Sequence, residues 1–311
     1  MTKIIILLFF ILLVLLLFNI ENFENDDQEN KCIYISSRGI LKSCDIKENN
    51  PKSSFTNIDN LNLDNVTNGC TIYVCLDSID DFIKKANDIN YNFILVSGDG
   101  DVTLSNEMVE KHKDFINSPK LIKWYSQNCI ATHPKIHKIP IGLDYHSDQD
   151  QINGYLSPIE HEKILLEIIN DSVPFYKRKP IAHSTFHFRL EYPNNYRTDA
   201  YNNINKDLVY YEPIRKERFA TYREQIKYAF IISPHGNGLD CHRTWEALIL
   251  GCIPIVKKSE LDELYVDLPV LIVNEWSDLT QQLLNDTIIQ YKYKNFNYNK
   301  LKLKYWIDKI K

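Results

Sequence analysis

Apolar residues along the chain fall into short runs that alternate with segments of helical spacing. In the first half this pattern predicts strands at 71–76, 92–97, 121–125 and 138–141, and helices at 79–89, 106–116 and 159–169. In the second half it predicts strands at 180–188, 229–233, 253–256 and 270–273, and helices at 199–204, 213–228, 241–250 and 276–291, with a helical turn at 261–265. Strands that alternate with helices indicate parallel βαβ units. We therefore expect an α/β protein with two Rossmann-like halves facing a cleft, and ligands at the carboxyl ends of the strands.

The N-terminus carries a separate signal. Residues 4–18 are an unbroken run of aliphatic and Phe side chains, with Lys3 before them and acidic residues after them. This pattern predicts a hydrophobic membrane segment at 1–20, interpreted as a single-pass type II signal-anchor that leaves the soluble domain lumenal or extracytoplasmic. A cleaved signal and a peripheral tail are the alternatives.

The rest of the chain divides into four parts. Residues 21–31 form an acidic stem, 32–175 the N-terminal Rossmann-like half, and 176–290 the C-terminal Rossmann-like half. Residues 291–311 form a basic C-terminal helix, which either packs back onto the globule or contacts a membrane surface.

The composition argues against nucleic-acid binding and against a metal site. The formal net charge is −5 and the pI about 6.0, so the chain lacks the basic excess that nucleic-acid binding requires. The seven cysteines form no C-x-x-C pair, and the nine histidines have no accompanying metal-ligand pattern. We predict no nucleic-acid partner and no resident metal site.

The clearest candidate site begins with Ser-Pro-His-Gly-Asn-Gly at 233–238, between a predicted buried strand and a predicted helix. Its two glycines and Asn237 allow left-handed backbone conformations, and they let main-chain N–H groups come close to a ligand. Asp240 fits the N-cap of the following helix and Gly251 its C-terminal end. A loop that enters a helix N-terminus in this way predicts an anion site.

Arg243 and Glu246 are three residues apart and fall on one face of that helix. A guanidinium can grip diphosphate oxygens with two parallel hydrogen bonds, and a carboxylate can accept from the two vicinal hydroxyls of a ribose. These are the two polar parts of a nucleoside diphosphate. The alternative is an i, i+3 surface ion pair that contributes a few tenths of a kcal/mol.

Residues 233–256, which read SPHGNGLDCHRTWEALILGCIPIV, resemble the C-terminal motif of exostosin-like glycosyltransferases. In that motif an Arg and a Glu precede Ala-Leu and a Gly-Cys-Ile-Pro turn. Residues 124–128 and 139–143 are also similar to first-half segments of related sequences. The strong match covers about two dozen residues, and the chain is shorter than animal exostosins and lacks a second catalytic domain, so donor and acceptor identity do not carry over.

The resemblance implies a GT-B architecture and a type II membrane glycosyltransferase of the secretory pathway. It would use a nucleotide sugar as co-substrate, transfer the sugar to a hydroxyl of a glycan or glycoprotein with inversion, and require no metal. The N-terminal half at 32–175 would take the acceptor and the C-terminal half at 176–290 the nucleotide sugar, with Arg243 binding the diphosphate and Glu246 the ribose. The predicted donor-binding residues are His235, Gly236, Asn237, Gly238, Asp240, His242, Arg243 and Glu246, with Arg189 and Arg197 as further candidates.

A second carboxylate pattern leaves an alternative open. Asp99 and Asp101 follow a predicted strand as Asp-x-Asp, the signature with which GT-A glycosyltransferases hold Mn²⁺ or Mg²⁺ against a diphosphate. In a GT-B enzyme either residue could instead be the catalytic base, and a simple Gly/Asp turn has no such role. A further alternative is a catalytically inactive glycan-binding protein that keeps the fold.

Overall fold

The computed structural model describes residues 28–48, 54–145, 156–191 and 194–311. The predicted signal-anchor at 1–20 and most of the predicted stem at 21–31 lie outside these residues. Within the described ranges, no helix combines the length and the apolar character needed to cross a membrane.

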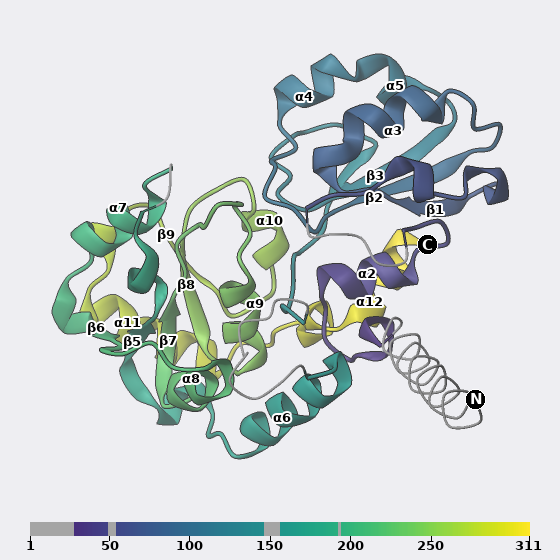
Figure 1. Ribbon diagram of the computed structural model, residues 1–311. Coiled ribbons are helices and arrows are strands. Elements are labelled where there is room, and N and C mark those ends of the chain that lie inside the picture. Colours follow the sequence, from purple (N-terminus) through teal and green to yellow (C-terminus); the bar gives the residue numbers. More distant parts are fainter. Residues whose placement is uncertain (1–27, 49–53, 146–155, 192–193) are drawn as a thin grey trace, which may run out of the picture.

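The first half contains one parallel sheet of four strands in the order β1-β2-β3-β4. Its strands are β1 (Cys70–Tyr73), β2 (Phe93–Ser97), β3 (Leu121–Ser126) and β4 (Ile136–Lys138). Helices α3 (Ile79–Ala86), α4 (Asn106–Lys111) and α5 (Lys113–Asn117) cover the face that points away from the second half (Figure 1).

The second half contains a parallel sheet of five strands in the order β6-β5-β7-β8-β9. The strands are β5 (Lys179–Ser184), β6 (Val209–Tyr211), β7 (Tyr228–Ile232), β8 (Ile253–Lys257) and β9 (Leu271–Val273). The helices are α6 (Pro158–Asn170), α7 (Tyr196–Asn203), α8 (Arg218–Gln225), α9 (His242–Ile249), α10 (Asp262–Tyr265) and α11 (Gln281–Lys292). Helix α6 comes before the boundary predicted at residue 175, but it packs against α8 in the second half. The two all-parallel sheets confirm the predicted α/β class and agree with Rossmann-like halves.

The strand order reverses direction between β5 and β7. From β5 the chain moves outward to β6, and it then returns to β7 on the other side of β5 and continues to β8 and β9. Open α/β sheets bind ligands beyond the carboxyl ends of the strands at such a reversal. The loop after β7 is the predicted anion loop.

Some predicted boundaries are wrong. The predicted helix at 106–116 is interrupted at His112, whose backbone angles are not helical. Helix α4 ends before this residue and α5 begins after it. The predicted helix at 213–228 begins only at Arg218, because the Glu217 carboxylate caps it by accepting from the N–H groups of Phe219 and Ala220. Strand β4 lies at Ile136–Lys138 rather than 138–141. Helix α2 (Ser37–Ser43) and strand β6 were not predicted at all.

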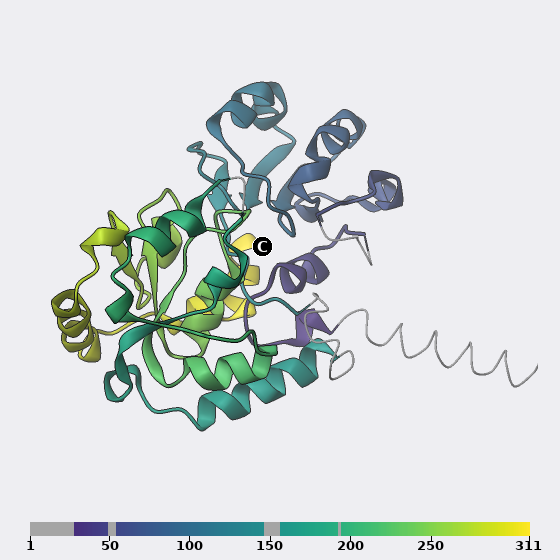
Figure 2. The same ribbon diagram turned by 60° about the vertical axis from the view of Figure 1, so that its left-hand side comes forward.

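The C-terminal segment crosses back to the first half. Helix α12 (Leu303–Ile310) lies beside α2, between the two sheets in both views (Figures 1 and 2). Trp306 is 1% exposed, and its Nε1–H donates to the Lys300 carbonyl at 2.8 Å. In the first half, the Tyr125 hydroxyl donates to the Lys309 carbonyl at 2.8 Å. The sequence left two alternatives for this basic segment, packing onto the globule and contact with a membrane surface. The structure supports packing onto the globule.

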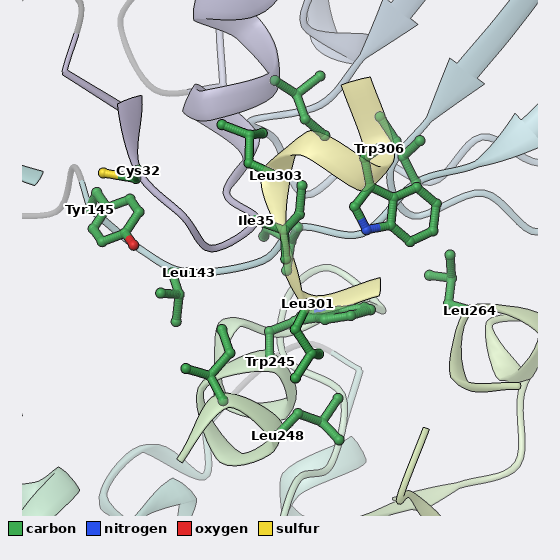
Figure 3. Close-up of a cluster of buried hydrophobic side chains, with 14 of the residues drawn as sticks. Cys32, Ile35, Leu143, Tyr145, Trp245, Leu248, Leu264, Leu301, Leu303 and Trp306 are labelled. Carbon is green, nitrogen blue, oxygen red and sulfur yellow. The ribbon is translucent and has the colours of Figure 1, made fainter. Parts of the chain in front are cut away.

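One buried apolar cluster spans both halves. It takes Ile94 and Val96 from one face of β2, whereas Phe93 and Leu95 from the other face pack under α3 to α5, as the alternation of a strand requires. Figure 3 shows Trp245 of α9 together with first-half and C-terminal side chains in this cluster. The halves therefore share a core, and their relative position is fixed partly by buried apolar area.

Candidate functional site

The anion loop, residues 233–239, joins the carboxyl end of β7 to α9. It is anchored at its start, where the Ser233 N–H donates to the Ile255 carbonyl at 2.9 Å and the Ser233 hydroxyl contacts the Thr244 hydroxyl at 2.8 Å. At its end, His235 Nδ1 donates to the Leu239 carbonyl at 2.6 Å. Of the loop residues, Asn237 is exposed and His235 is half-buried. The loop is thus a closed turn with its tip at the surface.

The expected left-handed backbone in this loop is wrong. Among the described glycines, positive φ angles occur at Gly69, Gly142 and Gly251, and not at either loop glycine, and Asn237 does not have a positive φ either. Gly238 is needed for a different reason, since a Cβ there would lie 2.8 Å from Asn128 Nδ2 and 3.1 Å from Asp101 Oδ1. The absence of a side chain lets the first half approach the loop backbone directly.

Asp240 is not the N-cap of α9, as the sequence suggested. Cys241 occupies that position, with no side-chain hydrogen bond to the helix. The Asp240 carboxylate is 3% exposed, and it accepts from the Ile141 N–H at 2.7 Å, from Trp245 Nε1 at 2.9 Å and from the Cys241 N–H at 3.0 Å. Burial raises the pKa of this carboxyl to about 6. Asp240 therefore links the second half to the end of β4 in the first.

The C-terminal end of α9 matches the prediction. Gly251 has φ +70°, and its N–H donates to the Leu248 carbonyl at 3.1 Å, while the Cys252 N–H donates to the Ala247 carbonyl at 2.8 Å. These two bonds form a Schellman motif, which ends the helix after Ile249. The helix is therefore short and its N-terminus remains directed at the loop.

Arg243 and Glu246 are both half-buried, and each has its own protein partner. Arg243 Nη1 donates to the Pro234 carbonyl at 3.1 Å, which holds the guanidinium beside the anion loop. Glu246 Oε1 accepts from the buried Tyr222 hydroxyl at 2.7 Å. No ion pair joins Arg243 to Glu246 among the residues that the structure describes. The surface ion-pair alternative is therefore wrong, and both groups are held in defined positions.

Loops at the carboxyl edge of the first sheet meet the anion loop. The exposed Asp101 accepts from the Gly238 N–H through Oδ1 and from Asn237 Nδ2 through Oδ2, both at 3.2 Å. Asn128, which follows β3, accepts from the Asp240 N–H at 2.8 Å and donates to the Gly100 carbonyl at 2.9 Å. The Asp101 carboxylate of the first half is therefore already hydrogen-bonded to the Gly238 N–H, one of the main-chain donors of the predicted anion site.

Asp99 has a different environment from Asp101. It is 4% exposed, has φ +55°, and its Oδ2 lies 3.3 Å from Arg38 Nη2. Its own N–H donates to Gln127 Oε1 at 2.5 Å. The two carboxylates of the Asp-x-Asp pattern therefore have separate partners. Among the described residues, no group of three or more His, Cys, Asp or Glu side chains could hold a metal ion.

His242 is the first residue of α9 and also contacts the first half. Its Nδ1 lies 2.8 Å from the Gly142 carbonyl oxygen. A carbonyl oxygen can only accept, so Nδ1 is the donor of this hydrogen bond. The contact holds the His242 ring between the helix N-terminus and the first half.

The segment after β5 borders the other side of the anion loop. Asn194 Nδ2 donates to the Gly236 carbonyl at 2.7 Å, and the Tyr196 ring packs edge-on against His235 at 5.1 Å. Arg197 Nη2 would lie 3.5 Å from a Cβ on Gly236, while Arg189 is exposed and its carbonyl accepts from Arg197 Nη1 at 3.2 Å. Of these two arginines, Arg197 is the one beside the loop.

Sequence reasoning missed several residues that shape the site. These are Arg38, Gln127, Asn128 and Tyr222. Asn128 had a usable signal, because it ends the segment 124–128 that resembles related first halves. Tyr222 and Arg38 had none, since each lies on a helix far in sequence from the group it contacts.

No model of a known protein family matches the chain, and no curated protein matches it either.

Proposed function

We propose that this chain is a nucleotide-sugar-dependent glycosyltransferase of the GT-B type. The observation that carries the proposal is the position of the anion loop and the α9 N-terminus at the reversal between β5 and β7, with Arg243 and Glu246 held at its edge. The resemblance of residues 233–256 to exostosin-like enzymes is the reason for proposing a nucleotide sugar as the donor. The absence of an Arg243–Glu246 ion pair among the described residues supports it, because neither side chain is engaged by the other.

In this proposal the donor diphosphate lies on the Asn237 N–H group and on the Arg243 guanidinium, because the Gly236 N–H already donates to the Gly238 carbonyl and the Gly238 N–H to Asp101. The positive end of the α9 dipole adds to the stabilisation of the leaving group. The Glu246 carboxylate, oriented by the Tyr222 hydroxyl, accepts from the ribose hydroxyls. Arg197, beside Gly236, and His242, the first residue of α9, are further candidates to contact the phosphates.

The transfer step needs a base from the first half. The acceptor hydroxyl oxygen attacks the anomeric carbon and gives its proton to a carboxylate, while the bond to the diphosphate oxygen breaks and the nucleoside diphosphate leaves with the electron pair. Attack opposite the leaving group inverts the anomeric carbon. Asp101 is the better candidate base, since it is exposed at the loop whereas Asp99 is buried against Arg38.

Two alternatives predict different behaviour. A GT-A type enzyme would hold Mn²⁺ or Mg²⁺ with Asp99 and Asp101, and donor binding would then require metal. The separate partners of these two carboxylates favour the metal-independent route. An inactive glycan-binding protein would bind ligands without turnover. The apolar segment at 1–20 makes a type II membrane anchor with a lumenal or extracytoplasmic domain part of the leading proposal.

The test is calorimetric titration of the full-length chain, in detergent, with UDP, GDP and their sugars in EDTA and in Mn²⁺. Arg243→Ala should weaken nucleotide binding about 10- to 150-fold, the equivalent of a lost charge-assisted hydrogen bond of about 1.5–3 kcal/mol. Arg223→Ala, on the exposed face of α8, is the matched control and should leave affinity unchanged.

The outcomes separate the proposals. If no nucleotide or nucleotide sugar binds, the proposed function is wrong. Binding only in Mn²⁺ favours the metal-dependent enzyme. Donor binding with no product detected by mass spectrometry across an acceptor screen favours the inactive glycan-binding protein.

A further inference from the structure

A groove of about 600 Å³ lies on the second half, at the C-terminal end of α9. The anion loop is at the other end of this helix, so the groove is separate from the proposed donor site. Its walls come from the segment after α6, the C-terminal ends of α9 and α11, the segment that leads from α11 to α12, and Tyr34 of the first half. Aromatic rings form much of its surface, namely Tyr34, Phe175, Tyr176, Tyr291, Phe296 and Tyr298.

All the charged side chains of the groove are cationic. Lys292, Lys294, Lys302 and Arg178 line it, and no Asp, Glu or His does. Lys292 and Lys294 form no ion pair with any carboxylate among the residues that the structure describes. The chain as a whole has a net charge of −5. A groove lined by four cations and no anion therefore has a local charge opposite to that of the whole protein. Its field favours an anionic ligand.

The cations lie next to the ring faces. Lys292 Nζ is 5.3 Å from the centroid of Tyr176, and Lys294 Nζ is 5.4 Å from that of Phe296 and 5.7 Å from that of Tyr291. Tyr176 is 39% exposed and Tyr298 48% exposed, so their rings and hydroxyls are accessible to a ligand. The surface therefore presents flat apolar faces, hydroxyl groups and positive charges side by side.

A compact phosphate ligand does not fit this surface. Arg178 is the one arginine among the residues that line the groove. Its guanidinium is already hydrogen-bonded within the protein, since it donates to the carbonyls of Val173 and Leu250 at 2.6 and 3.0 Å. The helix ends that line the groove are the C-termini of α9 and α11, and each carries the negative end of its helix dipole. Separate lysine point charges instead suit anions that are spaced along a chain.

We propose that this groove binds an anionic oligosaccharide, with the apolar faces of its sugar rings on the Tyr and Phe rings and its carboxylates or sulfates on Lys292 and Lys294. A pyranose has the flat C–H face that packs on an aromatic ring, as well as the hydroxyls that tyrosine can bind. An acidic peptide would satisfy the lysines but not the row of ring faces. The inference concerns a second site and goes beyond the transfer reaction.

The probe is a hexagalacturonate oligosaccharide, titrated into the full-length chain in detergent. Its fully methyl-esterified form has the same sugar rings without the charges, and hexaglutamate has the charges without the rings. The acidic oligosaccharide should bind at least 10-fold more tightly than either control ligand. Equal binding of the methyl ester, or of hexaglutamate, overturns the proposal, as does no binding of the acidic oligosaccharide.

The site is located with the double variant Lys292→Ala/Lys294→Ala, which should weaken hexagalacturonate binding about 5- to 30-fold. Lys84→Ala/Lys304→Ala removes two exposed lysines elsewhere and should have no effect. Tyr298→Ala should weaken the binding of the acidic oligosaccharide as well, through loss of a ring face. Unchanged affinity in the Lys292/Lys294 variant overturns the proposal.

The outcome does not depend on the proposed function. Arg243→Ala should abolish or weaken nucleotide binding and leave hexagalacturonate binding as in the wild type. If nucleotides fail to bind but the acidic oligosaccharide binds and is sensitive to Lys292 and Lys294, the groove is a glycan site in a protein of another function.

Discussion

Asp101→Asn is the substitution that tests the site most directly. The Asp101 carboxylate accepts from the Gly238 N–H and from Asn237 Nδ2, each at 3.2 Å. In the proposed function, the same loop must receive a diphosphate. Asn keeps an oxygen acceptor for Gly238 and nearly the same shape, so the variant removes the negative charge while it preserves the packing between the halves.

The magnitude follows from the charge and the exposure. Two unit charges about 4 Å apart repel by about 1 kcal/mol in water and about 4 kcal/mol at an effective dielectric constant of 20. Asp101 is exposed, so the lower part of this range applies, about 1–2 kcal/mol. Removing the charge should therefore tighten UDP binding about 5- to 30-fold. Added salt should shrink the difference, because exposed charges are screened.

Calorimetric titration of UDP in EDTA measures this effect. Asp88→Asn, which removes one exposed negative charge far from the loop along the chain, is the matched control and should leave the affinity unchanged. An unchanged affinity in Asp101→Asn would refute the placement of the diphosphate on this loop. A weaker affinity that appears only in Mn²⁺ would instead identify Asp101 as a metal ligand. If Asp101 is also the base, turnover of the nucleotide sugar falls although nucleotide binding improves.

Three further predictions concern stability, each measured by urea unfolding followed by circular dichroism. Asp240→Asn should lower the free energy of unfolding by about 1–3 kcal/mol, because its amide group cannot accept from all three buried N–H donors that the carboxylate serves; an unchanged midpoint would show that the contact between the halves contributes nothing. Trp306→Ala should cost about 3–5 kcal/mol through loss of a fully buried ring, whereas the exposed Lys304→Ala should change stability by less than about 0.5 kcal/mol. Burial, and secondarily Arg218, lowers the pKa of His161 to about 3 from its ordinary 6.5, so the folded state binds fewer protons than the unfolded state. This contribution to stability is complete above about pH 6.5, and about 2 kcal/mol of it is lost by pH 5; His161→Phe should flatten the slope, and an equally steep slope in that variant would contradict the assignment.

The hydrophobic pattern determined the class of the fold and most of its elements. Alternation of short apolar runs with helical spacing was enough to predict two parallel sheets, because the period of burial differs between a strand and a helix. The end of α9 at Gly251 was also readable, since a left-handed C-terminal residue favours glycine locally. What could be predicted depends on interactions within a few residues of the chain.

The same local rules failed where distant groups compete for a side chain. Asp240 has the residue type of an N-cap, yet its carboxylate accepts from the Ile141 N–H, 99 positions away in sequence. The loop glycines suggested left-handed turns, whereas Gly238 is required by the approach of Asn128 and Asp101 from the other half. Helix α2 is short, and the partner that buries it is α12, at the other end of the chain.

The chain by itself therefore determined which segments form most of the strands and helices, and which loop is the candidate anion site. Only the tertiary structure decided that Asp101 lies on that loop, that Asp99 is paired with Arg38, and that Glu246 is oriented by Tyr222. The physical reason is that secondary structure follows from backbone geometry and local burial, while side-chain partners across a shared core are set by how whole sheets and helices pack.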